Sequence, residues 1–223
     1  MIESIALFMQ EPSIRQLGMS RSCIVLAGGK SVRFGRDKTS ERFGNSSLLE
    51  QAISRIEPLV SEVILVAAEK RVFPQLESRR EIKTVSDVCP GQGALGGIYT
   101  GLMASNSFSN LVIAADMPFL NQSLLQYIFD VSEGYDFVLP RIGTFFEPLH
   151  AVYSKNCIQP AESIIRQGRK VIVELLDYVR VRYVEAEEID RFDPKHLSFF
   201  NINTKADLKL AKKIASQISC QQT

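Results

Sequence analysis

The chain has 223 residues, of which 45% are hydrophobic and 23% are charged, and its formal net charge is +1. This is the composition of an ordinary globular protein, and the near-zero charge gives no electrostatic attraction to nucleic acids or membrane surfaces. The four cysteines are scattered without a C-x-x-C pair, so neither a zinc site nor a disulfide framework is indicated. We therefore expect a cytoplasmic protein with no nucleic-acid or membrane partner.

The first 20 residues contain acidic side chains early and lack the continuous apolar core of a secretory signal. We expect residues 1–20 to form a poorly ordered N-terminal extension. No internal repeat or low-complexity linker divides the remainder, so we predict a single domain over residues 21–218.

A glycine-rich loop directly follows the first apolar run, residues 23–26, which predicts a buried strand. Two glycines let the backbone turn and present bare N–H groups, while Arg33 and Lys38 add two cations. Bare amides and cations on a loop at a strand end make an anion site, which we interpret as a phosphate site. A plain turn with solvated charges is the structural alternative. A P-loop is excluded because Ile24 stands where its first glycine is required.

Strands and helices then alternate through the first 130 residues, which predicts an α/β three-layer sandwich with a mostly parallel, Rossmann-like sheet. In such sheets ligands bind beyond the carboxyl ends of the strands, and the glycine loop, Asp87 and Asp116 all follow their strands there. The predicted elements are a helix over 48–60, a strand over 62–68, a helix around 73–79, a strand over 82–88, a helix ending at 104, a strand over 111–115 and a helix over 124–129.

The second half is expected to complete the same site. A capping box between Thr204 and Asp207 indicates the start of a C-terminal helix, directly after a short segment over residues 199–203. The other predicted elements are strands over 137–140, 145–153 and 179–185, and helices over 156–167 and 171–178.

Asp116 is the strongest candidate for a metal ligand, because it stands where a buried strand enters a turn. A carboxylate there can bind Mg²⁺, which takes oxygen ligands and neutralises polyphosphate. The alternative is a turn or cap residue, and that alternative is stronger for Asp87, which ends the preceding strand.

A competing interpretation is an NAD(P)-binding protein. Residues 91–96 fit the dinucleotide pattern G-x-G-x-x-G, and Asp116 follows at the spacing of a ribose-binding acid. The Cys-Pro pair at residues 89–90 interrupts the passage from strand to pattern, and the loop after residue 26 would then have no role.

Three polar residues of the second half remain. His150 lies in an apolar stretch, which favours a hydrogen-bonded strand histidine over a catalytic one. Asn201 and Asn203 project to the same side if their segment is extended, so they are either ligand-binding residues or turn and cap residues.

Five blocks of sequence, in order, carry a resemblance to a known family. They are LAGGKSVRFGRDK at 26–38, DVCPGQGALGG at 87–97, ADMP at 115–118, EPLHA at 147–151 and FNINT at 200–204. The first block resembles the signature L-A-G-G-x-x-x-R-x-G-x-D-K of the nucleotidyltransferases. Together the blocks most closely resemble the molybdenum cofactor guanylyltransferases of the MobA type, with alanine in the second block in place of the usual proline.

This resemblance implies transfer of GMP from GTP to Mo-molybdopterin, with Mg²⁺ as cofactor and release of pyrophosphate. Molybdoenzymes or their chaperones are the implied protein partners. Catalysis falls to Arg33, Lys38 and Asp116, with Asp116 also the metal ligand, and Asn201 and Asn203 face the pterin substrate. The implied nucleotide-binding residues are Leu26, Ala27, Gly28, Gly29, Lys38, Asp87 and Asp116.

One departure from the family pattern concerns the base. The family often has N-x-x-R after the second strand, where this chain has Ala67 and the three residues that follow it. That asparagine helps hold the nucleotide in the family, so a related transferase using CTP or another phosphorylated acceptor is the alternative. A non-catalytic nucleotide-binding or NAD(P)-binding protein is the alternative of another class.

Overall fold

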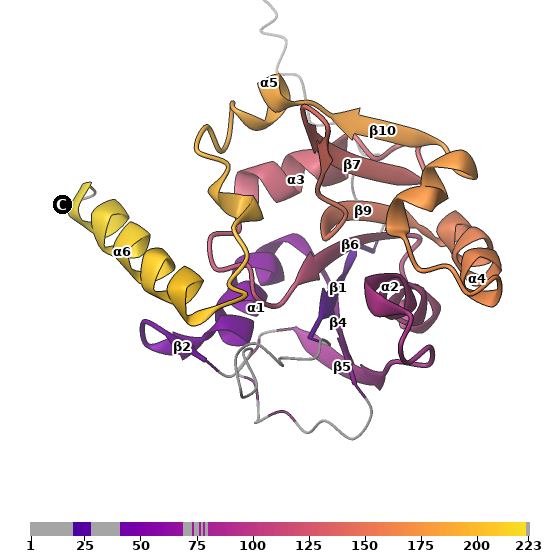
Figure 1. Ribbon diagram of the computed structural model, residues 1–223, viewed down its shortest axis with the longest axis horizontal. Coiled ribbons are helices and arrows are strands. Elements are labelled where there is room, and N and C mark those ends of the chain that lie inside the picture. The colour runs from indigo at the N-terminus through magenta and orange to yellow at the C-terminus, as the bar shows by residue number, and fades with distance from the viewer. Residues whose placement is uncertain are drawn as a thin grey trace, which may run out of the picture.

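The computed structural model describes residues 20–27, 41–68, 73, 76, 78 and 80–221. Within them an eight-stranded sheet runs in the order β10-β7-β9-β6-β1-β4-β5, and β8 pairs with β7 outside that path (Figure 1). The strands are β1 (Ser22–Leu26), β4 (Glu62–Ala67), β5 (Glu81–Ser86), β6 (Ser109–Ala114), β7 (Phe137–Ile142), β8 (Phe145–Phe146), β9 (His150–Ser154) and β10 (Val181–Val184). A separate two-stranded ribbon consists of β2 (Arg42–Phe43) and β3 (Ser46–Ser47).

The sheet is mostly parallel, as predicted. β1 is parallel to β4 and to β6, β4 is parallel to β5, and β7 is parallel to β10. Only β9 within the main path runs antiparallel to both of its neighbours, β6 and β7. Because β9 reverses between them, β6 and β7 point the same way, and their carboxyl ends lie at one edge with those of β1, β4 and β5.

Helices cover both faces of the sheet, which gives the three predicted layers (Figure 1). One apolar core lies under α1 and α3, and the other lies under α2 and α4. The α-helices are α1 (Leu48–Ile56), α2 (Gly93–Ala104), α3 (Gln122–Asp130), α4 (Ile158–Arg166), α5 (Ala186–Ile189) and α6 (Lys205–Gln221). Short 3₁₀ helices are η3 (Glu57–Leu59), η4 (Lys155–Cys157), η5 (Ile172–Asp177) and η6 (Leu197–Phe199). None of the helices described here is both long enough and apolar enough to cross a membrane.

The helix starts follow from local sequence. At α1 the Glu50 N–H donates to the Ser47 hydroxyl at 3.2 Å, and the Ser47 N–H donates to the Glu50 carboxylate at 2.6 Å. At α6 the predicted capping box is confirmed, because the Asp207 N–H donates to the Thr204 hydroxyl at 3.1 Å and the Thr204 N–H donates to the Asp207 carboxylate at 2.8 Å. This box fixes the point at which the chain leaves the sheet edge and enters α6.

Three predicted elements differ from the structure. The strand expected over 145–153 is divided into β8 and β9 by a turn that contains Pro148, because proline has no N–H to donate to a strand ladder. The helix expected over 171–178 is the 3₁₀ helix η5. Most of the helix expected around 73–79 lies outside the described residues, and the three described positions in it are not helical.

Candidate active site

The end of β1 lies between β4 and β6 at the carboxyl edge of the sheet. The Ala27 N–H donates to the Val66 carbonyl at 2.9 Å, and the Ala115 N–H donates to the Leu26 carbonyl at 3.1 Å. Leu26 and Ala27 are therefore fixed where the glycine loop begins. The remaining predicted loop residues lie outside the described residues, namely Gly28, Gly29, Arg33 and Lys38.

Asp116 follows β6 at the same edge and is only 7% exposed. Its backbone carbonyl accepts a hydrogen bond from the Ile202 N–H at 3.0 Å. Ile202 is fully buried, so this bond joins the end of β6 to the segment that carries Asn201 and Asn203. The structure thus brings together residues that are 85 or more positions apart in the sequence.

The two asparagines differ in their surroundings. Asn201 is partly exposed, and its side-chain amide donates to the Phe199 carbonyl at 3.0 Å. Asn203 is exposed, and its backbone N–H donates to the Asp207 carboxylate at 3.0 Å. Both flank the buried Ile202 beside Asp116, so they can contact a molecule bound at that point.

Asp87 has a structural role that the described contacts define. Its Oδ1 accepts hydrogen bonds from the Cys89 N–H at 2.9 Å and from the Thr100 hydroxyl at 3.1 Å, which ties the turn after β5 to α2. Asp116 lies three strands away, or about 14 Å at the usual strand spacing. These bonds correspond to the turn alternative, and a role for Asp87 in nucleotide binding stays a prediction.

The topology argues against the dinucleotide interpretation of residues 91–96. In a Rossmann sheet the ribose-binding acid ends the strand adjacent to the one before the glycine pattern. Here the pattern follows β5 at the sheet margin, and β4 and β1 separate β5 from the β6 strand that precedes Asp116.

The glycines of α2 serve helix packing instead. A Cβ at Gly96 would lie 2.8 Å from the Cys89 carbonyl oxygen. One at Gly101 would overlap Ile24 Cγ2 and lie 2.9 Å from Ile24 Cγ1, so α2 rests directly on β1. The close approach positions the strand that carries the candidate nucleotide loop.

His150 lies in β9 as predicted, but the expectation that it is hydrogen-bonded is wrong. The ring is fully buried, and neither nitrogen has a hydrogen-bond partner within the described part of the chain. The ring packs edge-on against Phe199 with centroids 4.9 Å apart. Burial lowers the pKa of the imidazole to about 3, so His150 is neutral at physiological pH.

Glu147 and Phe145 are residues at this edge to which the sequence analysis assigned no role, although Glu147 begins the EPLHA block. Glu147 lies in the turn between β8 and β9, partly buried, and burial raises the pKa of its carboxyl. Phe145 is 75% exposed in β8. Their two-residue spacing could have indicated that the two side chains lie on the same side of the chain, because alternate residues of an extended strand share a side.

A magnesium–nucleotide complex fits the donor set, although no group of three or more His, Cys, Asp or Glu side chains lies together in the described ranges. Mg²⁺ is usually held by one or two carboxylates together with substrate phosphates and water, not by a cage of protein ligands. The buried carboxylate of Asp116, which follows β6 beside the end of β1, is compatible with that mode.

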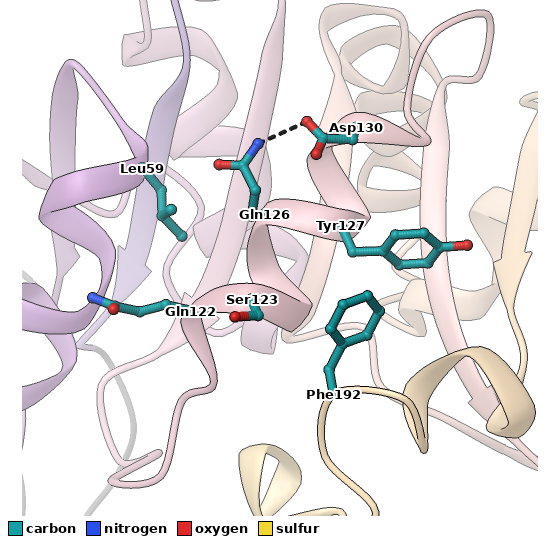
Figure 2. A pocket seen from close by; sticks show the side chains of 7 residues that line it. All are labelled: Leu59, Gln122, Ser123, Gln126, Tyr127, Asp130 and Phe192. Atoms are coloured by element: carbon teal, nitrogen blue, oxygen red, sulfur yellow. Dashed lines mark hydrogen bonds between the residues drawn. The ribbon is translucent and has the colours of Figure 1, made fainter.

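One surface hollow, of about 390 Å³, lies elsewhere on the outer side of α3 (Figure 2). None of the predicted site residues contributes to its wall, so it is distinct from the candidate active site. It is lined by Leu59, Gln122, Ser123, Gln126, Tyr127, Asp130 and Phe192.

The family model for the MobA-like NTP transferase domain matches residues 23–181. The chain therefore belongs to the MobA-like NTP transferases, a class of nucleotidyltransferases, and the family prediction from the motifs is confirmed. A relative from Pelotomaculum thermopropionicum, named probable molybdenum cofactor guanylyltransferase, is 33% identical over 192 residues, or 86% of this chain and 92% of the relative. A relative of the same name from Methanosarcina mazei is 37% identical over 198 residues, or 85% of this chain and 88% of the relative.

The fold is also that of a solved relative. The crystal structure of molybdopterin-guanine dinucleotide biosynthesis protein A from Archaeoglobus fulgidus is similar to this chain with a TM-score of 0.76 and 32% identity. The match covers 88% of this chain and 99% of that chain. The predicted fold class is thereby confirmed.

Proposed function

We propose that this protein transfers GMP from GTP to Mo-molybdopterin, giving the guanine dinucleotide form of the molybdenum cofactor and pyrophosphate. The names of the relatives support this activity. The observation that carries the proposal is the Ile202–Asp116 backbone bond, because it unites the motif after β6 with the asparagine motif of the second half.

In this reaction a terminal phosphate oxygen of the acceptor attacks the α-phosphorus of GTP. The bond from the α-phosphorus to its bridging oxygen breaks, and pyrophosphate leaves. Such a transfer needs little covalent chemistry from the protein and depends on positioning and on cancellation of negative charge. Arg33 and Lys38 are the proposed cations, and the backbone at Leu26 and Ala27 begins the loop that holds the phosphates.

Nucleotidyltransferases of this kind generally use a divalent metal, and we propose Mg²⁺ with Asp116 as its ligand. When bound, the ion would offset the charge of the triphosphate. Gly28, Gly29 and Asp87 complete the proposed nucleotide site, and Asn201 and Asn203 are proposed to face the acceptor. A cytoplasmic location and transfer of the product to molybdoenzymes or their chaperones stay predictions from the sequence.

The preference for guanine is the part of the proposal that has a specific alternative, which is cytosine. Ala67 stands where the family often has asparagine, and its backbone carbonyl accepts a hydrogen bond from the Asp87 N–H at 2.8 Å. Backbone groups at Leu26 and Ala27, on the adjacent strand, are the proposed readers of the guanine edge. A preference for CTP would reassign the protein to a cytidylyl transferase.

Thermal unfolding with added nucleotide tests the nucleotide site directly. GTP with Mg²⁺ should raise the melting temperature more than ATP, UTP, CTP or NAD(P), because a ligand stabilises a protein only through preferential binding to its native state. The control is each nucleotide without Mg²⁺. Clear stabilisation by NADH alone, with none by GTP, would return the dinucleotide interpretation to first place.

A further inference from the structure

The hairpin of β7 and β8 presents an aromatic ring to solvent. The two strands are antiparallel, with Arg141 opposite Phe146 and Ile142 opposite Phe145. At 75%, Phe145 has the largest exposed fraction among the large hydrophobic side chains of the described ranges. Burying such a ring against a ligand would remove its apolar surface from water.

The hairpin lies at the same edge of the sheet as Asp116. β7 pairs with β9 at Val138 and Val152, and β9 pairs with β6 at His150 and Ile113. Continuing this register beyond Val138 brings the hairpin level with the residues that follow β6. One strand, β9, separates β7 from β6 (Figure 1). At the usual spacing between strands the lateral distance is therefore about 10 Å.

Glu147 adds a carboxylate on the same side of the hairpin. Its backbone N–H donates to the Pro140 carbonyl at 3.0 Å, which extends the ladder one step beyond β8. Alternation along an extended segment then places the Phe145 and Glu147 side chains on one side. The Glu147 carboxylate is partly buried, and burial alone raises its pKa, with no hydrogen bond or charged neighbour from the described ranges acting on it. Such a carboxylate is partly withdrawn from water and can accept hydrogen bonds from a ligand with N–H donors.

The hairpin is held in place by its neighbours. The Arg141 Nε donates to the Glu185 carboxylate at 3.0 Å, and the guanidinium lies 4.3 Å from the centre of the Tyr183 ring. Phe146 packs against the same tyrosine with centroids 5.9 Å apart. The side of the hairpin opposite Phe145 is therefore anchored to β10 and its end, which favours a preformed binding surface.

An exposed aromatic ring with a carboxylate on the same side of the hairpin suits a flat heterocycle with two adjacent N–H donors on one edge. The 2-amino-4-oxopyrimidine ring has this edge, and both guanine and pterin contain it. Guanine and pterin would bind at different positions along the edge of the sheet. The nucleotide loop follows β1, Asp116 follows β6, and the hairpin lies on the far side of β6 from β1. Because the reacting phosphate lies between donor and acceptor, the hairpin is on the acceptor side.

We propose that Phe145 and Glu147 form the subsite for the pterin ring of the acceptor, with Phe145 stacking on the ring and Glu147 accepting its N–H and 2-amino hydrogens. This inference rests on the proposed function, because it assigns the acceptor half of that site.

Steady-state transfer of GMP provides the first test, with Phe145→Ala and Glu147→Gln as variants. Each should raise the KM for Mo-molybdopterin about tenfold, as expected for loss of a stacked ring or a charged hydrogen-bond acceptor, and leave the KM for GTP unchanged. Phe145→Tyr should retain near-normal KM because it keeps the ring. The matched controls are Phe108→Ala, a 47% exposed ring before β6, and Glu133→Gln, which follows α3.

Equilibrium binding of 6-hydroxymethylpterin, followed by its fluorescence, provides a test that needs no transfer. The comparison ligand is the corresponding lumazine, in which a carbonyl replaces the 2-amino group. The wild type with GTP bound should prefer the pterin about tenfold, and Glu147→Gln should lose that preference, because an amide donates as well as accepts hydrogen bonds.

The two assays separate this inference from the proposed function. Pterin preference that depends on Glu147, in a protein that transfers no GMP, would overturn the proposed reaction and retain the subsite. Normal transfer by wild type together with unchanged acceptor KM in both variants would overturn the subsite alone. A raised KM for GTP instead of the acceptor would assign the hairpin to guanine, and equal binding of pterin and lumazine by wild type would also overturn the inference.

Discussion

At the scale of single residues, Asp116 carries the most specific claim about chemistry. It is buried at the end of β6, and its backbone carbonyl is bonded to Ile202. The backbone bond explains why the residue is in place, whereas the proposed metal role depends on the carboxylate. A substitution that changes only the charge can therefore separate the two roles.

Asp116→Asn should lower turnover by about a hundred- to a thousandfold, the range seen when one electrostatic contact to a transition state is lost, or about 3–4 kcal/mol. The melting temperature should change little, because asparagine keeps the side-chain volume and the backbone bond. The measurement is pyrophosphate release at saturating GTP, with circular dichroism melting alongside. Asp130→Asn is the matched control, since Asp130 forms a surface ion pair with Arg21 at 3.0 Å, away from the site. Near-normal turnover with a lowered melting temperature would remove Asp116 from the mechanism.

The buried environment of His150 is the clearest case in which a described side chain lowers the stability of the folded protein. A buried ring whose two nitrogens have no hydrogen-bond partner among the described residues costs free energy, and burial lowers its pKa to about 3. A group with a lowered folded-state pKa contributes stability above its unfolded pKa of about 6.5, and that contribution is lost as the pH falls toward 3.

His150→Leu should therefore be at least as stable as wild type at pH 7 and markedly more stable at pH 5. The difference in unfolding free energy should grow by about 1.4 kcal/mol for each pH unit below about 6.5. Urea denaturation at pH 7, 6 and 5 gives the comparison. His196→Asn removes the only other histidine of the chain, at a position whose φ of 51° suits asparagine. Because it leaves the buried imidazole in place, the effect of His150→Leu should persist when it is measured in the His196→Asn background. If the unfolding free energies of wild type and His150→Leu changed equally with pH, the buried imidazole would not titrate as expected.

At the scale of elements, the contact between α2 and β1 positions the end of β1, where the proposed nucleotide loop begins. Gly97 and Gly101 face β1, and the absence of side chains lets the helix approach Leu26 and Ile24. The glycine-rich start of α2 thus has a packing explanation that requires no dinucleotide.

Gly101→Ala should destabilise the protein by about 1–3 kcal/mol, because its Cβ would overlap the branched side chain of Ile24 in a close-packed core. Gly97→Ala is the graded control. Its Cβ would lie 3.1 Å from the flexible end of Leu26, and the gain in helix propensity of up to about 1 kcal/mol offsets that crowding. Melting temperatures rank the two variants. If Gly101→Ala were as stable as wild type, the claim that α2 approaches β1 too closely for a side chain at residue 101 would be contradicted.

At the scale of the whole molecule, local patterns predict what depends on neighbouring residues in the chain. The apolar run of β4 indicated a strand buried on both faces, and Thr204 with Asp207 indicated the start of α6. The direction of β9 could not be predicted in this way, because an apolar strand has the same pattern whether it pairs parallel or antiparallel.

Features that depend on distant neighbours were also out of reach of pattern reasoning. Nothing local in the sequence indicates that Ile202 bonds to Asp116, and the family resemblance alone linked those two motifs. The ring of His150, which has no hydrogen-bond partner among the described residues, and the burial of the Glu147 carboxyl depend on which distant segments the fold packs around them. Sequence reasoning therefore located the strand ends at this edge of the sheet but not the contacts that join the two halves of the chain there.

The most direct test of the proposed reaction follows the α-phosphate of radiolabelled GTP in a mixture of the protein, Mg²⁺ and Mo-molybdopterin. The account predicts label in a guanine dinucleotide product, one pyrophosphate for each transfer, and much slower transfer from CTP under the same conditions. Omitting the acceptor should abolish pyrophosphate release. Faster transfer from CTP, or no label in the pterin product with a folded protein that binds GTP, would contradict the proposed guanylyltransferase activity.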